Sequence, residues 1–533
     1  MTSRMNQNVD PLVVQTIQKL RKKAAQSCKL GVDVTRTEFR IGYEFPGEED
    51  PCTDIIFNVQ EDEPEYEEVI PAIGEILAQG YAQLQHFRLS WLTFERNSYP
   101  QFWRGLAANQ VLKEVCFIDV PIPNEPDVFR FLTNPALELL DMSNCHFSHG
   151  TVHSFFQGIQ SSHIKKLKID ATHRAAGVSW SLLWRALEHG ATCLECLQIG
   201  YSTINIHGIE NGFESFLANN TTIQSIHLCN MMRGRDDLPL FVALGRGLAV
   251  NTTVKILDLC FPYFLGNPAI GEPLIQTVFA EGLHQNMAVE SLKVEMKVCP
   301  ETVNALADGL ERMMRNRANA ATHDGLDQEE SMPILKELVF YPGGNSVGDV
   351  STPDALREIF FDRLSQSDVI LVETVKFDLQ QRVLSLSCKV YDFIRSTKVT
   401  KSLLLYRVCD LSPDNKLANL ADAMEANHSI AELEVQDVQF HKMTNLLFQP
   451  NTYRIRCQCR RNEIQAHTLR KPENLSLLPL VLAKLLPSGD RPADDEERQK
   501  MEAHQLVDRT IAFELLKDIP ALFAVCGKRK RED

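Results

Sequence analysis

The chain has 533 residues, of which 44% are hydrophobic and 23% are charged. This composition supplies enough apolar side chains for a continuous core and excludes wholesale disorder. The formal net charge of −15 disfavours nonspecific attraction to nucleic acid or to anionic lipid, so we expect neither as a partner. The chain is too long for one ordinary core, so it forms either several domains or a repeat array.

Residues 1–83 are interpreted as an N-terminal cap. Residues 11–26 predict a helix, residues 32–59 predict short strands and turns, and the acidic stretch EDEPEYEE that follows is expected to be solvated. The first thirty residues contain no apolar run of the kind a signal peptide needs, and nowhere do about 18 uncharged apolar residues follow one another. We therefore expect a cytoplasmic protein without a membrane span.

A recurring string runs through residues 84–445. In its clearest copies an Asn is followed three residues later by an apolar residue, with further apolar residues three and five places beyond that. These copies are Asn134 leading into LELLDM, Asn220 into IQSIHL, Asn251 into VKILDL, Asn286 into VESLKV and Asn427 into IAELEV. Less complete copies start at residues 84, 112, 164, 194, 335, 372 and 400, which makes twelve units.

The spacing of the copies is typical of one strand plus one helix. Starting positions mostly differ by 25 to 37 residues. Apolar residues alternate within each string, as Ile226 and Leu228 do, which is typical of a strand with one buried face. Between the strings the apolar period becomes helical, as in residues 152–159, 240–248 and 417–424. Because no single unit can bury both surfaces alone, we predict a parallel sheet, an outer layer of helices and a shared core.

The Asn of each string directly follows the preceding helix. The backbone often turns left-handed at that location, and Asn tolerates this conformation better than most residues. We therefore expect a left-handed backbone at these positions.

The string resembles the leucine-rich-repeat family, specifically the ribonuclease-inhibitor-like subclass with its consensus LxxLxLxxNxL. The best copy fills all five consensus positions with Leu137, Leu140, Met142, Cys145 and Phe147. Most other units depart from the consensus at the Cys position. The resemblance implies an α/β leucine-rich-repeat solenoid, a curved horseshoe with a parallel inner sheet, outer helices and atypical caps at both ends.

Two regions depart from the repeat. An interval of 46 residues separates the strings at Val289 and Leu335, and its polar stretch without a clear apolar period predicts an insertion near residues 315–333. Residues 446–533 are interpreted as a C-terminal helical cap, with two apolar helices separated by an acidic loop. The run KRKR at residues 528–531 is either a nuclear import signal or a solvated basic tail.

The sequence offers no recognisable catalytic, cofactor or metal motif. The strings GxxxxGK[ST], GxSxG and HExxH are missing. Cysteine pairs at residues 193/196 and 457/459 are not accompanied by a second pair at the spacing of a zinc site. We expect no enzyme activity, no cofactor, no bound metal and no small-molecule substrate.

Residues that alternate with the buried ones should line the inner, concave side of the array and form one broad surface. In chain order these residues are His86, Arg88, Asp141, Ser143, Lys166, Lys168, Gln198, Ser225, His227, Asp258, Ser291, Lys293, Glu295, Tyr341, Lys376, Asp378, Tyr406, Glu432 and Glu434. Charges of both signs mixed with aromatics favour a protein partner over a polyanion. Many of these residues would be ordinary solvent-facing side chains, and roughly a quarter would matter for binding.

The resemblance implies a non-catalytic scaffold or adaptor that binds a protein partner, of unknown identity, on this concave face. The alternative is a regulator of a small GTPase similar to Ran GTPase-activating proteins, which share this repeat subclass. Nothing in the sequence singles out the loop residues that such an activator requires.

Overall fold

The computed structural model of this chain shows a repeated strand and helix, grouped in two compact units. Unit 1 comprises Met1–Phe264 and Thr277–Val289, and unit 2 comprises Leu265–Gln276 and Glu290–Asp533. The residues that the structure describes are 31–34, 38–42, 74–75, 77–78, 85–90, 99–118, 120–123, 128–143, 145–147, 149–171, 180–189, 193–201, 212–229, 238–261, 271–296, 300–323, 334–342, 353–378, 387–406, 414–435, 438–439, 454–455, 457–459 and 461–462.

Unit 1 contains a sheet that is parallel from its second strand onward. Its strands are β1 (Gly31–Val34), β2 (Glu38–Gly42), β3 (His86–Ser90), β4 (Glu114–Ile118), β6 (Leu139–Ser143), β8 (Lys166–Ala171), β9 (Cys196–Tyr201), β10 (Ser225–Cys229) and β11 (Ile256–Phe261). β1 pairs antiparallel with β2, and each later strand pairs in parallel with the one before it. A separate parallel pair joins β5 (Pro121–Ile122) and β7 (His146–Phe147). The N-terminal region thus adds β2 to the same sheet as the repeats.

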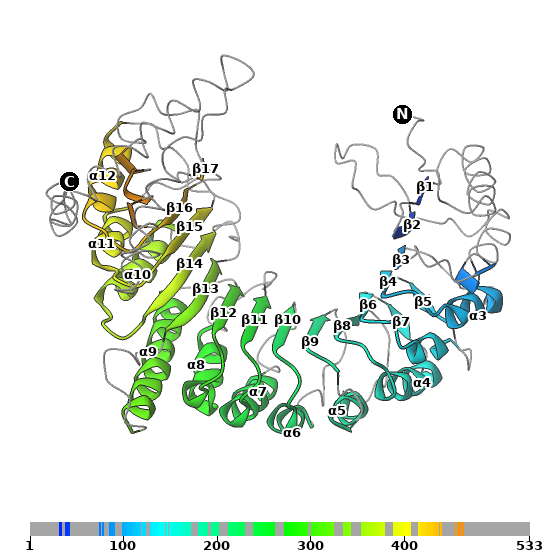
Figure 1. The fold of residues 1–533 in the computed structure, drawn as a ribbon. Coiled ribbons are helices and arrows are strands. Elements are labelled where there is room, and N and C mark those ends of the chain that lie inside the picture. The colour runs from blue at the N-terminus through cyan, green and yellow to red at the C-terminus, as the bar shows by residue number, and fades with distance from the viewer. Residues whose placement is uncertain are drawn as a thin grey trace, which may run out of the picture. The chain divides into compact units, whose positions relative to one another are not determined.

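The helices of unit 1 alternate with these strands along the chain. They are α3 (Pro100–Ala108), η1 (Arg130–Thr133), α4 (His149–Gln160), α5 (Trp180–His189), α6 (Phe213–Asn219), α7 (Leu238–Val250) and η4 (Leu283–Gln285), and α8 (Gly271–Glu281) is divided between the units. Within unit 1 they lie on one side of the strands (Figure 1).

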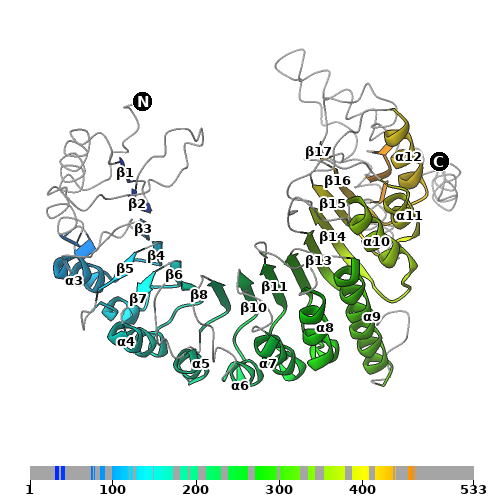
Figure 2. The ribbon, with the colours of Figure 1, turned by 180° about the vertical axis from the view of Figure 1, so that it is seen from behind.

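Unit 2 repeats the same arrangement. Its parallel strands are β12 (Ser291–Met296), β13 (Leu335–Pro342), β14 (Val372–Asp378), β15 (Ser402–Tyr406) and β16 (Glu432–Val435), and β17 (Val438–Gln439) pairs antiparallel with β16. Its helices α9 (Pro300–His323), α10 (Pro353–Gln366), α11 (Cys388–Ser396) and α12 (Asp414–Glu425) cover one side of the sheet (Figure 2). All twelve predicted strings form strands, and the predicted helical segments 152–159, 240–248 and 417–424 lie within α4, α7 and α12.

The core lies between the strands and the helices because each contributes one apolar face. Ile226 and Leu228 of β10 are at most 1% exposed, and so are Leu244 and Leu248 of α7. Burying one such side chain contributes about 1.5–3 kcal/mol. Among the helices of the described ranges, we find none whose length and hydropathy would let it cross a membrane.

The Asn at the start of each string does not have a left-handed backbone. Asn109, Asn134, Asn220 and Asn286 have φ between −72° and −65° and ψ between 118° and 131°. Among non-glycine residues whose backbone is described, only Tyr99 has a positive φ, of 43°. The expectation drawn from the sequence was therefore wrong.

The Asn side chain instead ties each repeat to the one before it. Oδ1 of Asn251 accepts hydrogen bonds from the backbone N–H groups of Thr253 (2.9 Å) and Val254 (2.8 Å). Its Nδ2 donates to the carbonyl oxygens of Leu217 (2.7 Å) and Asn220 (3.1 Å) in the preceding repeat. The same four-bond rung recurs at Asn286 and Asn427. A short side chain that carries both a donor and an acceptor suits this role, which explains the repeated Asn.

The first part of the stretch predicted as an insertion is helical. α9 continues to His323, so it includes residues 315–323 of that stretch. This segment is rich in alanine and arginine, which favour helices, although it shows no simple apolar period. Residues 324–333 lie outside the described residues.

A short helical segment after the repeats contacts the last helix and the last Asn rung. Arg454 bonds to Glu425 (2.5 Å) and to Asp422 (2.7 Å) of α12. Gln458 donates to the carbonyl of Asn427 at 2.8 Å, and Asn462 donates to the carbonyl of Ile430 at 2.7 Å. These amides satisfy backbone groups that a further repeat would otherwise meet.

Several sequence predictions lie outside the described residues. They are the helix at 11–26, the acidic stretch after residue 59, the two apolar segments 475–487 and 510–525, the acidic loop between them and the basic run 528–531.

Candidate functional site

The sheet face opposite the helices carries the side chains that alternate with the buried ones, and it is termed the helix-free face. The parallel register aligns these side chains into rows that cross the strands. The central row of unit 1 consists of Arg88, Cys116, Asp141, Lys168, Gln198, His227 and Asp258. The central row of unit 2 consists of Lys293, Val339, Lys376, Leu404 and Glu434.

The repeat geometry decides the fold class. One parallel strand per repeat, helices on one side of the sheet and a buried Asn rung between successive repeats characterise both units. Each unit is a segment of leucine-rich-repeat solenoid.

Ion pairs hold the charged side chains of unit 1 in place. Lys168 lies 3.1 Å from Asp141, and Ser143 also donates a hydrogen bond to Asp141. His86 lies 2.7 Å from Glu114 in the neighbouring strand. These contacts link side chains of adjacent leucine-rich repeats on the helix-free face.

His227 lies at the centre of a polar network on β10. Its Nδ1 lies 3.1 Å from Oδ2 of Asp258, and its Nε2 lies 2.6 Å from Oγ of Ser225. The hydrogen bond to Asp258, then the contact with Cys196, raises the pKa of His227 to about 9 although burial opposes the shift. At neutral pH the ring is therefore an imidazolium. It cannot accept the Ser225 proton, so this Ser–His–Asp arrangement is a charge pair and not a general base with its nucleophile.

The thiol of Cys116 is kept neutral on the same face. Burial, followed by the charge of Asp141, raises the pKa of Cys116 to about 12. Because the thiolate is the reactive and metal-binding form, this cysteine is inert near neutral pH. Among the described residues, no group of three or more His, Cys, Asp or Glu side chains is placed to hold a metal ion.

Unit 2 shows a similar set of linked charges. Lys376 lies 2.6 Å from Glu337, and Ser291 donates to the same carboxylate at 2.9 Å. Burial would raise the pKa of Glu337, but the hydrogen bonds from Lys376 and Ser291 outweigh it and lower that pKa. Lys293 lies 5.5 Å from the ring centre of Tyr341. This contact gives the face a cation–π pair beside its ion pairs.

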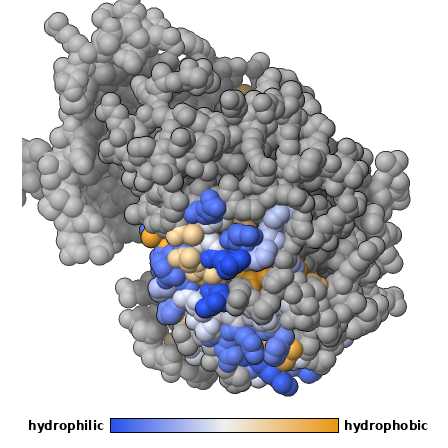
Figure 3. Space-filling view, turned by 90° about the vertical axis from the view of Figure 1, so that its right-hand side faces the viewer, coloured by the Kyte–Doolittle hydropathy of each residue, from blue (hydrophilic) through white to orange (hydrophobic). Residues whose placement is uncertain are grey.

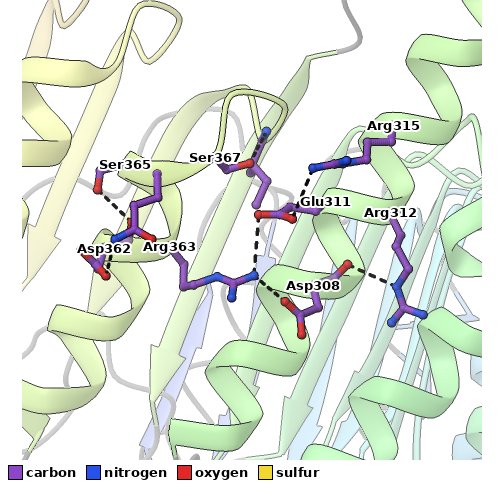
Figure 4. Close-up of polar contacts among 10 residues, drawn as sticks. Asp308, Glu311, Arg312, Arg315, Asp362, Arg363, Ser365 and Ser367 are labelled. Carbon is purple, nitrogen blue, oxygen red and sulfur yellow. Dashed lines mark hydrogen bonds and ion pairs between the residues drawn. The ribbon is translucent and has the colours of Figure 1, made fainter.

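The helical side of unit 2 also pairs its charges. Arg363 of α10 bonds to Asp308 and lies 3.6 Å from Glu311, both on α9 (Figure 4). Arg315 lies 3.9 Å from Glu311, and Arg312 donates to the carbonyl of Asp308 at 3.3 Å. This network on α9 and α10 compensates its own charges.

Figure 3 faces the right-hand side of Figure 1, where the N-terminal elements of unit 1 lie. In this view the described surface residues are mainly hydrophilic, with a few hydrophobic ones among them.

The register places all nineteen predicted residues on the helix-free face of their units. Six of them are at most 9% exposed, namely Ser143, Ser225, Asp258, Ser291, Glu295 and Glu434. Asp378 and Tyr406 occupy strand positions on this face, but their side chains lie outside the described set. Whether any of the nineteen binds a partner stays a prediction.

Further side chains share the same face but were not predicted from the sequence. They include Glu114, Cys116, Cys196, Glu337, Val339, Ser402 and Leu404. Each alternates with buried residues of its own strand. A strict alternation applied to every string would have found them, because the period of a strand is two.

Comparison with known proteins yields distant similarity to solved structures. No family model and no curated protein matches the chain. An internalin from Listeria monocytogenes is 13% identical with a TM-score of 0.29, and the match covers 77% of this chain and 93% of that one. The Toll–Spätzle complex from Drosophila is 9% identical with a TM-score of 0.23, covering 76% of this chain and 55% of that one. With scores this low, the leucine-rich-repeat fold rests on the strands and contacts of the chain itself.

Proposed function

We propose that this protein is a non-catalytic scaffold or adaptor that binds a protein partner on its helix-free face. The observation that supports the proposal is a row of charged and polar side chains fixed by ion pairs on neighbouring strands, such as Lys168 with Asp141 and Lys376 with Glu337. Side chains that are already ordered lose less entropy on binding than free ones. Mixed charge with a neighbouring aromatic, Tyr341, fits a protein surface better than a polyanion.

Affinity capture with the full chain tests this function. We would reverse three cations of the helix-free face, Lys168, Lys293 and Lys376, to glutamate, and identify co-purified proteins by mass spectrometry. The matched control reverses three exposed cations that lie off the strands, namely Arg104, Arg185 and Lys398. We expect the first variant to lose specific partners that the control retains. Equal recovery by both variants would refute the proposed surface.

We also propose the repeat subclass, the bounds of the caps and the repeat array, and the location of the protein. Repeat spacings of mostly 25 to 37 residues, with a helix in most units, support the ribonuclease-inhibitor-like subclass. We also propose residues 1–83, 84–445 and 446–533 as cap, repeat array and cap. A cytoplasmic or nuclear location is proposed because the fourteen cysteines lack the close, regular spacing of a secreted disulfide scaffold and because of the basic run 528–531. Imaging of the full chain with and without that run tests it.

Regulation of a small GTPase is the competing function. No contact among the described residues favours it over a scaffold. Stimulation of GTP hydrolysis in a panel of small GTPases by the full chain would replace the scaffold proposal with this one.

A further inference from the structure

Glu434 of β16 is a nearly buried carboxylate that no described residue compensates. It is 9% exposed, and among the described residues neither a hydrogen bond nor an ion pair reaches its carboxylate. Buried charges are normally paired, because desolvating an isolated ion costs several kcal/mol. Glu434 lies between the core residues Leu433 and Val435 of β16, so it belongs to the helix-free face, in the central row of unit 2.

The neighbouring cations of unit 2 are already engaged. Leu404 lies directly beside Glu434 in the register, and Lys376 follows on the next strand. Lys376 lies 2.6 Å from Glu337, and Lys401 bonds to Glu373. Neither of these two cations is therefore left to neutralise Glu434.

A second carboxylate stands on the same strand and the same face. Glu432 precedes Glu434 by two residues, is exposed, and accepts a hydrogen bond from Ser402. The half-buried Leu404 lies beside these two carboxylates, so an apolar side chain is bordered there by negative charge.

We propose that Glu432 and Glu434 anchor an arginine side chain of a protein partner, with the arginine stem packed on Leu404. The alkyl stem of arginine covers apolar surface while its planar guanidinium donates forked hydrogen bonds to carboxylates. Lysine is a compact, strongly hydrated charge without a planar fork, so it fits this pair of carboxylates beside Leu404 less well. The assignment rests on the proposed function and names the chemistry of the partner at β16.

The assignment implies a trade-off between stability and binding. While the partner is absent, the uncompensated charge of Glu434 weakens the folded state, and the arriving guanidinium removes that cost. Replacing Glu434 by glutamine should therefore raise the thermal midpoint of the full chain and weaken binding at the same time. A residue with a purely structural role would not combine these two effects.

The binding test uses fluorescein-labelled octa-arginine as the probe and fluorescence anisotropy at roughly 150 mM salt, which screens long-range attraction. The variant carries Glu432→Gln and Glu434→Gln. The matched control, Glu214→Gln with Glu358→Gln, removes two exposed carboxylates from helices and has the same net charge. We expect about tenfold weaker binding for the variant, the effect of losing one charge-assisted hydrogen bond pair, and less than about a twofold change for the control.

Four results would overturn the assignment. They are an equal loss of binding in the control, unchanged binding in the variant, octa-lysine binding as tightly as octa-arginine, and a lowered thermal midpoint for Glu434→Gln. Partner capture separates this inference from the proposed function. If the three-cation reversal abolishes capture while the Glu432/Glu434 variant retains it, the helix-free face stands as the binding surface and the arginine anchor is refuted.

Discussion

Replacing Asn286 with alanine should break one rung between successive repeats. Asn286 is 1% exposed, and its Nδ2 donates to the carbonyl oxygens of Leu248 (2.6 Å) and Asn251 (2.9 Å). Its Oδ1 accepts from the N–H groups of Ala288 (2.8 Å) and Val289 (2.7 Å). Alanine removes all four hydrogen bonds and leaves two donors and two acceptors of the backbone without this partner.

The expected loss follows from the cost of unpaired polar groups. A buried backbone group without a partner costs about 1–3 kcal/mol. The bond to Ala288 is only part-buried, so water can replace it, whereas the bonds to Leu248, Asn251 and Val289 are buried. We therefore expect a loss of about 3–5 kcal/mol in the free energy of local opening. Stability in a repeat protein is a sum of nearest-neighbour terms, so the loss should stay within adjacent repeats.

Hydrogen exchange followed by mass spectrometry measures this directly. Peptides covering residues 251–261 and 283–289 should exchange at least about a hundredfold faster in the variant, while residues 402–406 should keep their rate. The control is Asn219→Ala, since Asn219 is exposed and donates to Glu188 at 2.8 Å. Its effect should stay within about 0.5 kcal/mol. Equal exchange in the two variants would refute the role assigned to the Asn rung.

Three further changes have defined outcomes. The raised pKa of His227, about 9 against an ordinary 6.5, stabilises the fold fully below pH 6.5. That contribution, on the order of 3 kcal/mol, should be lost as the pH rises through 9. In denaturant unfolding, the free energy of unfolding of His227→Gln should therefore fall less over this pH range than that of the unchanged chain. Gly282→Ala would place a Cβ 2.3 Å from the carbonyl oxygen of Gly245, so the thermal midpoint should fall by an amount equivalent to about 1–3 kcal/mol. Trp184→Ala removes a side chain that is 1% exposed and lies 4.6 Å from Phe213 between ring centres, which should cost about 3–5 kcal/mol in denaturant unfolding, and Trp184→Phe should cost less.

Periodicity in the sequence was sufficient to predict the repeated strands and helices and which residues of each strand face the core. The alternation of Ile226 and Leu228 placed one face of β10 in the core, and the register confirms that Ser225 and His227 share the other face. This worked because burial of a strand or helix depends on the spacing of apolar residues within a few positions.

Contacts between repeats required the tertiary structure. The sequence marked Asn251 as a recurring residue but suggested a backbone role, whereas its amide bonds to Leu217 in the preceding repeat. In the same way, Lys376 is engaged by Glu337 of the neighbouring strand, while Glu434 is left without a described cation. Local patterns place a side chain on a face, but its partner comes from a strand roughly thirty residues away in a repeat of this class, and only the register of the folded sheet selects that partner.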